Sequence, residues 1–348
     1  MNNPLIRQSV EELTAYTPGE QPSSGGIIKL NTNENPYPPS PQVDEVLKKL
    51  AAGSLRLYPD PLSRALRHKI AEIHECDVSQ VFAGNGSDEI LALCTRAYVE
   101  DRGSIGYFNP SYSLYPVLAD IRDADKRPVE LGKDFEWVMP AGYQCSLFFL
   151  TNPNAPTSQR HSTALVEQFA RALKGVLVID EAYADFAREN CMELAQRCPN
   201  VLVMRTLSKS YSLAGLRVGY AVGNCDLIDA LFKIKDSYNL DRISQALAFA
   251  ALSDPDYMRA NVARIVATRD RFTRSLEAMG HSVFPSETNF LWIKPAGVSA
   301  RRVFELLRIR RIMVRYFEGP RTAEFLRITV GTDKEMDDLL SAMKGLVI

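Results

Sequence analysis

Short apolar segments alternate with helical patterns between residues 81 and 222, and this alternation limits the possible folds more than any other feature of the chain. Strands that are apolar along their whole length must be covered on both faces, which is typical of a mostly parallel sheet sandwiched between helices. The sequence therefore predicts an α/β fold in which ligands gather at the carboxyl ends of the strands. Strands are predicted at 104–108, 127–131, 146–150, 176–180, 201–204 and 218–222, with helices between several of them, such as 163–173.

The pattern differs on either side of this region. Residues 1–41 are rich in Pro, Asn, Gly and Ser, which favours an N-terminal arm that packs with a small domain or a dimer partner. Residues 42–252 are expected to form the large domain. Beyond them, a long amphipathic helix opened by Asp254-Pro255 precedes further short strands and helices. We predict that residues 253–348 form a smaller α+β domain.

Composition argues against several classes of function. The 348 residues carry a net charge of −1 and no basic stripe, so nucleic acid is not an expected partner. The first residues lack the apolar core of a signal peptide, and no segment approaches a membrane span, so no membrane partner is expected. The six cysteines are scattered, and the four histidines lack ligand-spaced partners apart from His74 and Cys76, which a surface loop explains better. We predict a cytoplasmic, reduced protein without a metal ion.

A lysine beyond one predicted strand is the first candidate for chemistry. Strand 201–204 leads into Ser208-Lys209, and the following segment, 213–222, is apolar around Arg217. Most lysines are solvated surface residues, but an apolar setting favours a lowered pKa and reaction with a carbonyl group. A serine–lysine hydrolase built on Ser208 and Lys209 is a remote alternative.

Further polar groups follow other predicted strands. Residues 84–89 form a glycine-rich turn that opens a helix, where free N–H groups favour a phosphate, although an ordinary turn has the same appearance. Asp180 ends an apolar strand and must be hydrogen-bonded or functional, or else cap a helix. Arg327 is a charge on an apolar strand that could equally face outward. An amine, an acid, a phosphate site and a distal arginine together suit pyridoxal phosphate.

An ordered set of motifs makes this interpretation more specific. They are LNTNENPYPPSP, YPDP, GNGSDE, NPSYSLY, NPNAPT, VIDEAY, RTLSKSYSLAGLRVGY, KDSYNLD and LRITVG. From about Leu13 to Gly345 the chain resembles the fold-type I, class I/II aminotransferases, and among them the histidinol-phosphate branch. The resemblance implies pyridoxal 5'-phosphate as cofactor, a homodimer, and amino transfer between L-histidinol phosphate and 2-oxoglutarate in histidine biosynthesis.

Other activities stay open at this point. A broad-specificity or aromatic amino-acid aminotransferase uses the same cofactor, and so does a threonine-phosphate decarboxylase, which also needs an anion pocket. A non-catalytic regulator that binds the cofactor is a more remote alternative, because the chain carries no basic extension of the winged-helix kind.

The resemblance implies a role for each matched residue. Lys209 matches the lysine that bonds to the cofactor and moves the substrate proton, Asp180 the partner of the ring nitrogen, and Tyr183 the donor to the ring hydroxyl. Tyr112 matches the aromatic residue that stacks on the ring.

The remaining matched positions bind the cofactor's phosphate or the substrate. The phosphate would be held by backbone N–H groups of Gly86, Ser87 and Asp88, by Thr206, Ser208 and Arg217, and by Tyr58 of a neighbouring subunit. Substrate-side positions are Tyr16, Asn33, Arg315 and Arg327, of which Arg327 is expected to bind the anion; Asn35, Tyr238 and Asn239 match less closely.

Two positions depart from the family's pattern. The family commonly has Asn-Pro-Thr-Gly where this chain has residues 155–158, APTS, so Ala155 replaces the asparagine that usually contacts the ring oxygen. Asn154 could substitute through a shifted backbone, or Tyr183 could make the contact alone, at a cost of about 1 kcal/mol for one lost hydrogen bond. Serine at position 158 is compatible with function only if its turn does not need a positive φ.

Overall fold

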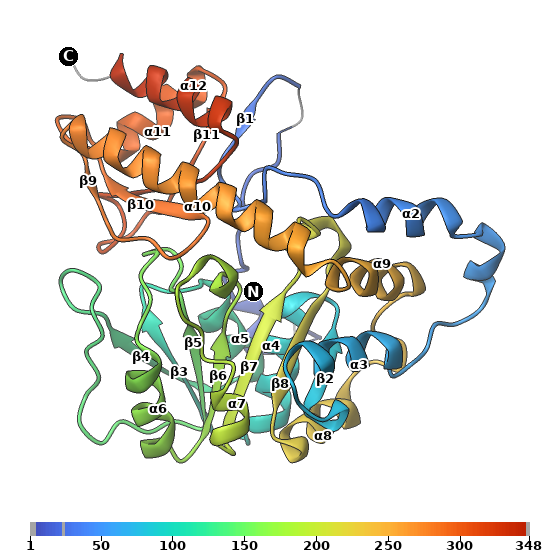
Figure 1. Ribbon diagram of the computed structural model, residues 1–348. Helices are drawn as coiled ribbons and strands as arrows, with labels where there is room; N and C mark the ends of the chain where they lie inside the picture. The colour runs from blue at the N-terminus through green and yellow to red at the C-terminus, as the bar shows by residue number, and fades with distance from the viewer. Residues whose placement is uncertain (1–4, 23–24, 346–348) are drawn as a thin grey trace.

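The computed structural model describes residues 5–22 and 25–345. Among them the largest sheet has seven strands in the order β2-β8-β7-β6-β5-β3-β4 (Figure 1). Strand β8 runs antiparallel to its neighbours β2 and β7, while the other pairs are parallel, so the predicted mostly parallel sheet is confirmed. The strands are β2 (Val81–Gly84), β3 (Ser104–Asn109), β4 (Asp125–Glu130), β5 (Leu147–Thr151), β6 (Val176–Asp180), β7 (Val201–Thr206) and β8 (Gly219–Gly223).

Helices cover both faces of this sheet because successive side chains of its strands point to opposite sides. On β6, Leu177 and Ile179 belong to one buried cluster, whereas Val178 belongs to another. The first cluster includes residues of α3 (Arg64–Ile73), α6 (Thr163–Ala172), α7 (Leu194–Arg197) and α9 (Arg242–Leu252). The second includes residues of α4 (Gly86–Tyr98), α5 (Leu114–Arg122) and α8 (Cys225–Ile234).

A smaller four-stranded antiparallel sheet lies beside the large one, in the order β12-β13-β10-β9. Its strands are β9 (Ser282–Val283), β10 (Phe290–Lys294), β12 (Arg315–Tyr316) and β13 (Leu326–Thr329), and its core is shared with α11 (Ala300–Ile309) and α12 (Asp333–Lys344). Helix α10 (Pro255–Ala278) runs from the vicinity of the large sheet to the small one (Figure 1). The two sheets use separate parts of the chain, and the division near residue 252 stays a prediction.

Residues 312–316 form two short strands with different partners. β11 (Ile312–Met313) pairs in parallel with β1 (Ile28–Lys29) of the arm, whereas β12 pairs with β13. The backbone therefore changes sheets at Val314, which an apolar pattern does not reveal.

The arm reaches the carboxyl edge of the large sheet after leaving β1. The amide of Asn35 donates hydrogen bonds to the carbonyls of Lys209 and Ser210, each at 3.1 Å. The remaining helices are α1 (Gln8–Glu11), α2 (Pro41–Lys49) and the 3₁₀ turns η1 (Ala52–Arg56), η2 (Val78–Gln80), η3 (Ala184–Phe186) and η4 (Ala214–Leu216). Within the described ranges, none of the helices combines the length and apolar character that a bilayer span requires.

Candidate active site

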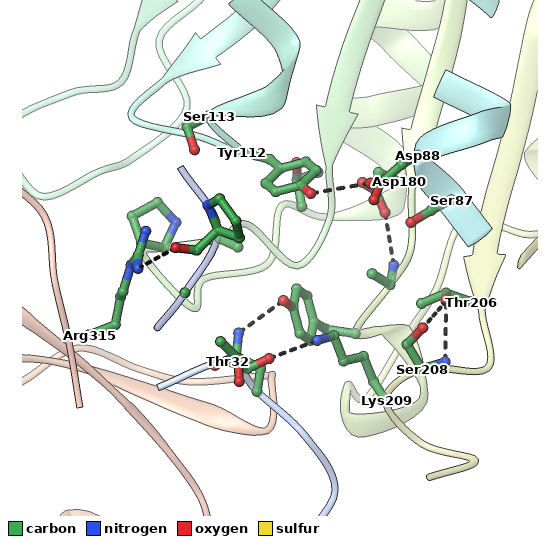
Figure 2. A pocket seen from close by; sticks show the side chains of 18 of the residues that line it. Thr32, Ser87, Asp88, Tyr112, Ser113, Asp180, Thr206, Ser208, Lys209 and Arg315 are labelled. Carbon is green, nitrogen blue, oxygen red and sulfur yellow. Dashed lines mark hydrogen bonds between the residues drawn. The ribbon is translucent and has the colours of Figure 1, made fainter. Parts of the chain in front are cut away.

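A cavity of about 290 Å³ lies at the carboxyl edge of the large sheet. The segments that follow strands of the large sheet line one side of it, and the arm and the small sheet line the other (Figure 2). Most of the residues matched from the sequence meet here, namely Tyr16, Asn33, Ser87, Asp88, Tyr112, Asp180, Tyr183, Thr206, Ser208, Lys209, Arg217, Arg315 and Arg327.

Lys209 lies in the turn after β7 and points into this cavity. Its Nζ donates to the carbonyl oxygen of Thr32 at 3.0 Å (Figure 2). Burial, followed by the positive charge of Arg327, lowers the pKa of Lys209 to about 8, while the carboxylate of Glu34 acts in the opposite direction. A lysine with such a pKa yields the neutral amine more readily than an ordinary lysine, as a nucleophile requires.

Asp180 forms the floor of the cavity at the end of β6. Its Oδ2 accepts a hydrogen bond from the hydroxyl of Tyr115 at 3.0 Å, and its Oδ1 accepts one from the N–H of Ala182 at 3.1 Å. Burial raises the pKa of Asp180 to about 6. A cationic N–H group in the cavity would favour the carboxylate form, so this position suits the partner of a protonated ring nitrogen.

Two tyrosines lie near these groups. The hydroxyl of Tyr183 accepts a hydrogen bond from the amide of Asn33 at 2.9 Å, and burial raises the pKa of Tyr183, so its phenol keeps its proton. The hydroxyl of Tyr112 donates to Oδ1 of Asp88 at 3.2 Å (Figure 2). Both rings border the space next to Lys209.

An anion site lies where α4 begins. The side chain of Asn85 makes no capping hydrogen bond, so the first N–H groups of α4 stay available for an anion. Arg217 places Nη1 3.3 Å from Ser208 Oγ and Nη2 3.3 Å from Asp88 Oδ2, and the hydroxyl of Thr206 lies 2.9 Å from that of Ser208. Gly86 has φ +79°, and a Cβ there would lie 2.6 Å from Arg217 Nη2. Any side chain at position 86 would have to displace this guanidinium, and the positive φ itself favours glycine.

A second group of positive charge lies on the small sheet. Arg315 and Arg327 are directly opposite each other on β12 and β13, and their guanidinium carbons lie 5.2 and 5.3 Å from the ring centre of Phe317. Arg327 donates to the carbonyl of Asn31, but its Nε has no acceptor, and neither arginine pairs with a carboxylate of the described residues. Like charges on facing residues repel, so an anion beside this pair would be favoured by both guanidinium groups.

Three of the closely matched residues do not line the cavity, and neither do the less closely matched Asn35, Tyr238 and Asn239. Gly86 lies behind Arg217, as described above. Asn154 is buried, and its amide donates to the carbonyl of Pro110 and to Thr157 Oγ1. Tyr58 is 76% exposed and stacks on Tyr238 with ring centres 4.3 Å apart, outside the cavity.

The turn at Ser158 differs from the expectation that it avoids positive φ. Ser158 has φ +64°, a conformation that costs a residue with a side chain about 1–2 kcal/mol. Its hydroxyl donates to the carbonyl of Pro285 at 3.1 Å, a contact that glycine lacks and that offsets part of this cost. The substitution is therefore accommodated by a new hydrogen bond rather than by a relaxed turn.

Sequence reasoning missed several residues of the site. Tyr115 is the last residue of the NPSYSLY motif, and Thr32 lies within LNTNENPYPPSP, so both motifs contained a signal. Thr151, whose Oγ1 lies 2.6 Å from the hydroxyl of Tyr115, and Phe317 lie outside the motifs used. Their roles come from contacts between distant segments.

The residues around this cavity fit pyridoxal phosphate. Lys209 offers an amine for its aldehyde, Asp180 a carboxylate for its ring nitrogen, and the first turn of α4 with Arg217 an anion site for its phosphate. An α/β sheet that carries this set at its carboxyl edge defines a pyridoxal-phosphate-dependent transferase of fold type I.

Comparison with known proteins identifies the family within this class. The chain belongs to the aminotransferase class I and II family, whose model matches residues 25–343. It is 45% identical to the histidinol-phosphate aminotransferase of Citrifermentans bemidjiense over 343 residues, covering 98% of both chains. It is also 45% identical to the histidinol-phosphate aminotransferase of Syntrophotalea carbinolica, covering 99% of each. Its fold matches the crystal structure of histidinol-phosphate aminotransferase from Sinorhizobium meliloti in complex with pyridoxal-5'-phosphate, with a TM-score of 0.88, 25% identity and 99% coverage of both chains.

We predict that Gly86→Ala weakens cofactor binding. The new methyl group displaces the Arg217 guanidinium, and losing one charged hydrogen bond to the phosphate raises the dissociation constant of pyridoxal phosphate about tenfold or more. The measurement is titration of the apoenzyme with the cofactor, followed by absorbance. The control is Gly215→Ala, since a Cβ there meets nothing within 4 Å. Unchanged affinity in Gly86→Ala would contradict the proposed phosphate site.

Proposed function

We propose that this chain is an aminotransferase that uses pyridoxal 5'-phosphate to exchange an amino group between L-histidinol phosphate and 2-oxoglutarate, in histidine biosynthesis. The products in that direction are imidazole-acetol phosphate and L-glutamate. Two relatives named histidinol-phosphate aminotransferase are 45% identical to it over nearly the whole chain. The observation that carries the proposal is the pair Arg315 and Arg327, which face the cavity of Lys209 without a carboxylate partner among the described residues.

The residues at the floor of the cavity would prepare the reaction. When bound, pyridoxal phosphate supplies an electron-withdrawing ring that stabilises negative charge on the substrate's α carbon. Asp180 keeps a proton on the ring nitrogen, and Tyr183 donates a hydrogen bond to the ring oxygen. Lys209, with its lowered pKa, is placed to take the proton from the α carbon and to return it to the cofactor side.

The anion sites would hold the two ends of the reactants. The N–H groups of Ser87 and Asp88, together with Thr206, Ser208 and Arg217, bind the phosphate of the cofactor. Arg315 and Arg327 bind the phosphate of histidinol phosphate or a carboxylate of the second substrate. A guanidinium presents a planar set of donors that fits both kinds of anion.

We further propose a cytoplasmic homodimer. Tyr58 lies with other exposed apolar residues of the same region, Leu55, Leu57 and Tyr238, each more than 40% exposed. Exposed apolar side chains gathered in one region are a common mark of a protein–protein interface. In such a dimer Tyr58 would reach the phosphate in the neighbouring subunit. The six free thiols are consistent with a reducing compartment.

The decisive experiment compares substrates on the same enzyme. We expect kcat/KM for amino transfer to be highest with histidinol phosphate, because its phosphate dianion pairs with Arg315 and Arg327 together, whereas phenylalanine offers them only a singly charged carboxylate. With threonine phosphate we expect no release of carbon dioxide. A higher kcat/KM with phenylalanine would establish an aromatic aminotransferase, and carbon dioxide from threonine phosphate would establish a decarboxylase.

We predict that Asp180→Ala keeps the cofactor but loses turnover. The phosphate site is untouched, so the dissociation constant of pyridoxal phosphate changes little. Without the carboxylate the ring nitrogen loses its proton, and loss of one such electrostatic contact lowers the single-turnover rate about 10²–10³-fold. Single-turnover spectroscopy measures the effect, and a rate near that of the wild type would refute the role of Asp180.

We predict that Arg327→Ala weakens the substrate far more than the cofactor. Removing a buried charged partner of an anion costs about 2 kcal/mol or more, which corresponds to a roughly thirtyfold higher dissociation constant for histidinol phosphate. Arg302→Ala serves as the control, because Arg302 lies exposed on α11 and pairs with Glu305. Equal weakening of substrate and cofactor in Arg327→Ala would contradict the assignment.

A further inference from the structure

We infer that Asn33 is a positioning residue that aims the hydroxyl proton of Tyr183 at the cofactor's ring oxygen. The inference rests on the proposed cofactor and deepens the account of that site. It also changes the role that the sequence resemblance implied for Asn33, which was contact with the substrate.

Asn33 is held by three separate elements at once. Its N–H donates to Thr329 Oγ1 on β13 at 3.0 Å, and its carbonyl accepts from the amide of Asn289 at 3.0 Å. Its side-chain Oδ1 accepts from Thr329 Oγ1 at 3.0 Å, and its Nδ2 donates to the Tyr183 hydroxyl at 2.9 Å. Asn33 is 1% exposed. Both polar atoms of its side chain are therefore engaged by the protein itself.

The buried hydroxyl of Thr329 fixes which way the amide of Asn33 points. A threonine hydroxyl has one proton, and here its oxygen already accepts the N–H of Asn33. The proton of Thr329 must find an acceptor, and Oδ1 of Asn33 is the acceptor in reach. The opposite orientation would leave the buried proton of Thr329 without an acceptor among the described residues. The amide therefore presents its nitrogen, a donor, to Tyr183.

Because of this orientation, the hydroxyl of Tyr183 can donate its proton only toward the cavity. Its oxygen accepts from Asn33, so its own O–H has to point elsewhere. No described residue accepts a hydrogen bond from this hydroxyl, and Tyr183 lines the cavity. The phenol is therefore a preset donor to whatever oxygen lies in the cavity beside it.

The substitution at position 155 makes this donor more important in this chain. Ala155 lines the cavity with a methyl group and cannot donate. The amide of the preceding residue, Asn154, is turned toward Pro110 and Thr157 instead. Of the two donors expected for the ring oxygen, Tyr183 alone stays in place. The hydrogen bond to the ring oxygen therefore depends entirely on the residue that orients Tyr183.

The test measures the cofactor's absorption without any substrate. In the holoenzyme, the visible band of the cofactor bonded to Lys209 changes as the proton shared by the ring oxygen and the bonded nitrogen is lost. A donor to that oxygen competes with this proton and lowers the apparent pKa. Asn33→Asp keeps the shape and the Thr329 contact but gives Tyr183 an acceptor, which draws its proton out of the cavity. We expect the apparent pKa to rise by about one unit, the equivalent of one hydrogen bond.

Second-site variants separate positioning from a general loss of structure. Ala155→Asn supplies the missing donor and should restore the apparent pKa in the Asn33→Asp background. In Tyr183→Phe, where no hydroxyl remains to be oriented, Asn33→Asp should add no further shift. If Asn33→Asp does not fold, Thr329→Val tests the same point, because it frees the amide to turn. Thr329→Ser is its control and should titrate like the wild type.

The outcomes distinguish this inference from the proposed function. An apparent pKa unchanged in Asn33→Asp, or in Thr329→Val, would overturn the inference, and so would a rise in KM for histidinol phosphate without any spectral shift. A wild-type protein that shows no cofactor band would instead refute the proposed cofactor. Failure to use histidinol phosphate, with the spectral shift intact, would refute the substrate and leave the role of Asn33 standing.

Discussion

The parallel register of β5, β6 and β7 is the constraint on which the site depends. Thr151 lies opposite Asp180, and Asp180 lies opposite Met204, so β5 and β6 end at one level and β7 continues beyond it to Thr206. Parallel strands bring their carboxyl ends to the same edge, and the side chains that follow them meet without further adjustment. Lys209 comes five residues after Met204 in the chain, and Tyr115 joins Thr151 to Asp180. A shift of one residue in β6 would turn Asp180 to the opposite face.

The charged side chains close to the site form two pairs, one of opposite charges that neutralise each other and one of like charges. Glu181, next to Asp180, is fully buried, yet it accepts two hydrogen bonds from Arg205, at 2.8 and 3.0 Å. That pair is internally satisfied, and removing one member would leave a buried charge without a partner. Arg315 and Arg327 have no such carboxylate among the described residues, although they lie on facing strands. The first pair is satisfied within the protein, whereas we propose that the second binds an anion of the substrate.

The sequence predicted a mostly parallel sheet because most of its strands are apolar along their whole length. The strand order, with β8 antiparallel between β2 and β7, and the exposed edge strand β4 do not follow from that pattern. The sequence also pointed to Lys209, Asp180 and Arg217 as candidates, because Asp180 ends β6 and the other two lie in one motif between β7 and β8. It did not predict the contacts of Thr32, Thr151 or Phe317, which arise between segments far apart in the chain. The switch of partners at Val314 and the positive φ of Ser158 depend on hydrogen bonds that a linear pattern does not contain. The role of Tyr58 needs a second subunit, so one chain leaves it a prediction.

The arm connects the two halves of the site, and this connection limits which substrates fit. Lys209 belongs to the large sheet's edge and Arg327 to the small sheet, while residues 31–35 of the arm contact both. The carbonyl of Asn31 accepts a hydrogen bond from Arg327, and the carbonyl of Thr32 accepts one from Lys209. The side chain of Asn33 is hydrogen-bonded to both Thr329 and Tyr183. Three successive residues thus fix the spacing between the amine and the anion site. A substrate must span that spacing between its own amino group and its anion, so selectivity depends on the arm's backbone as much as on the arginines.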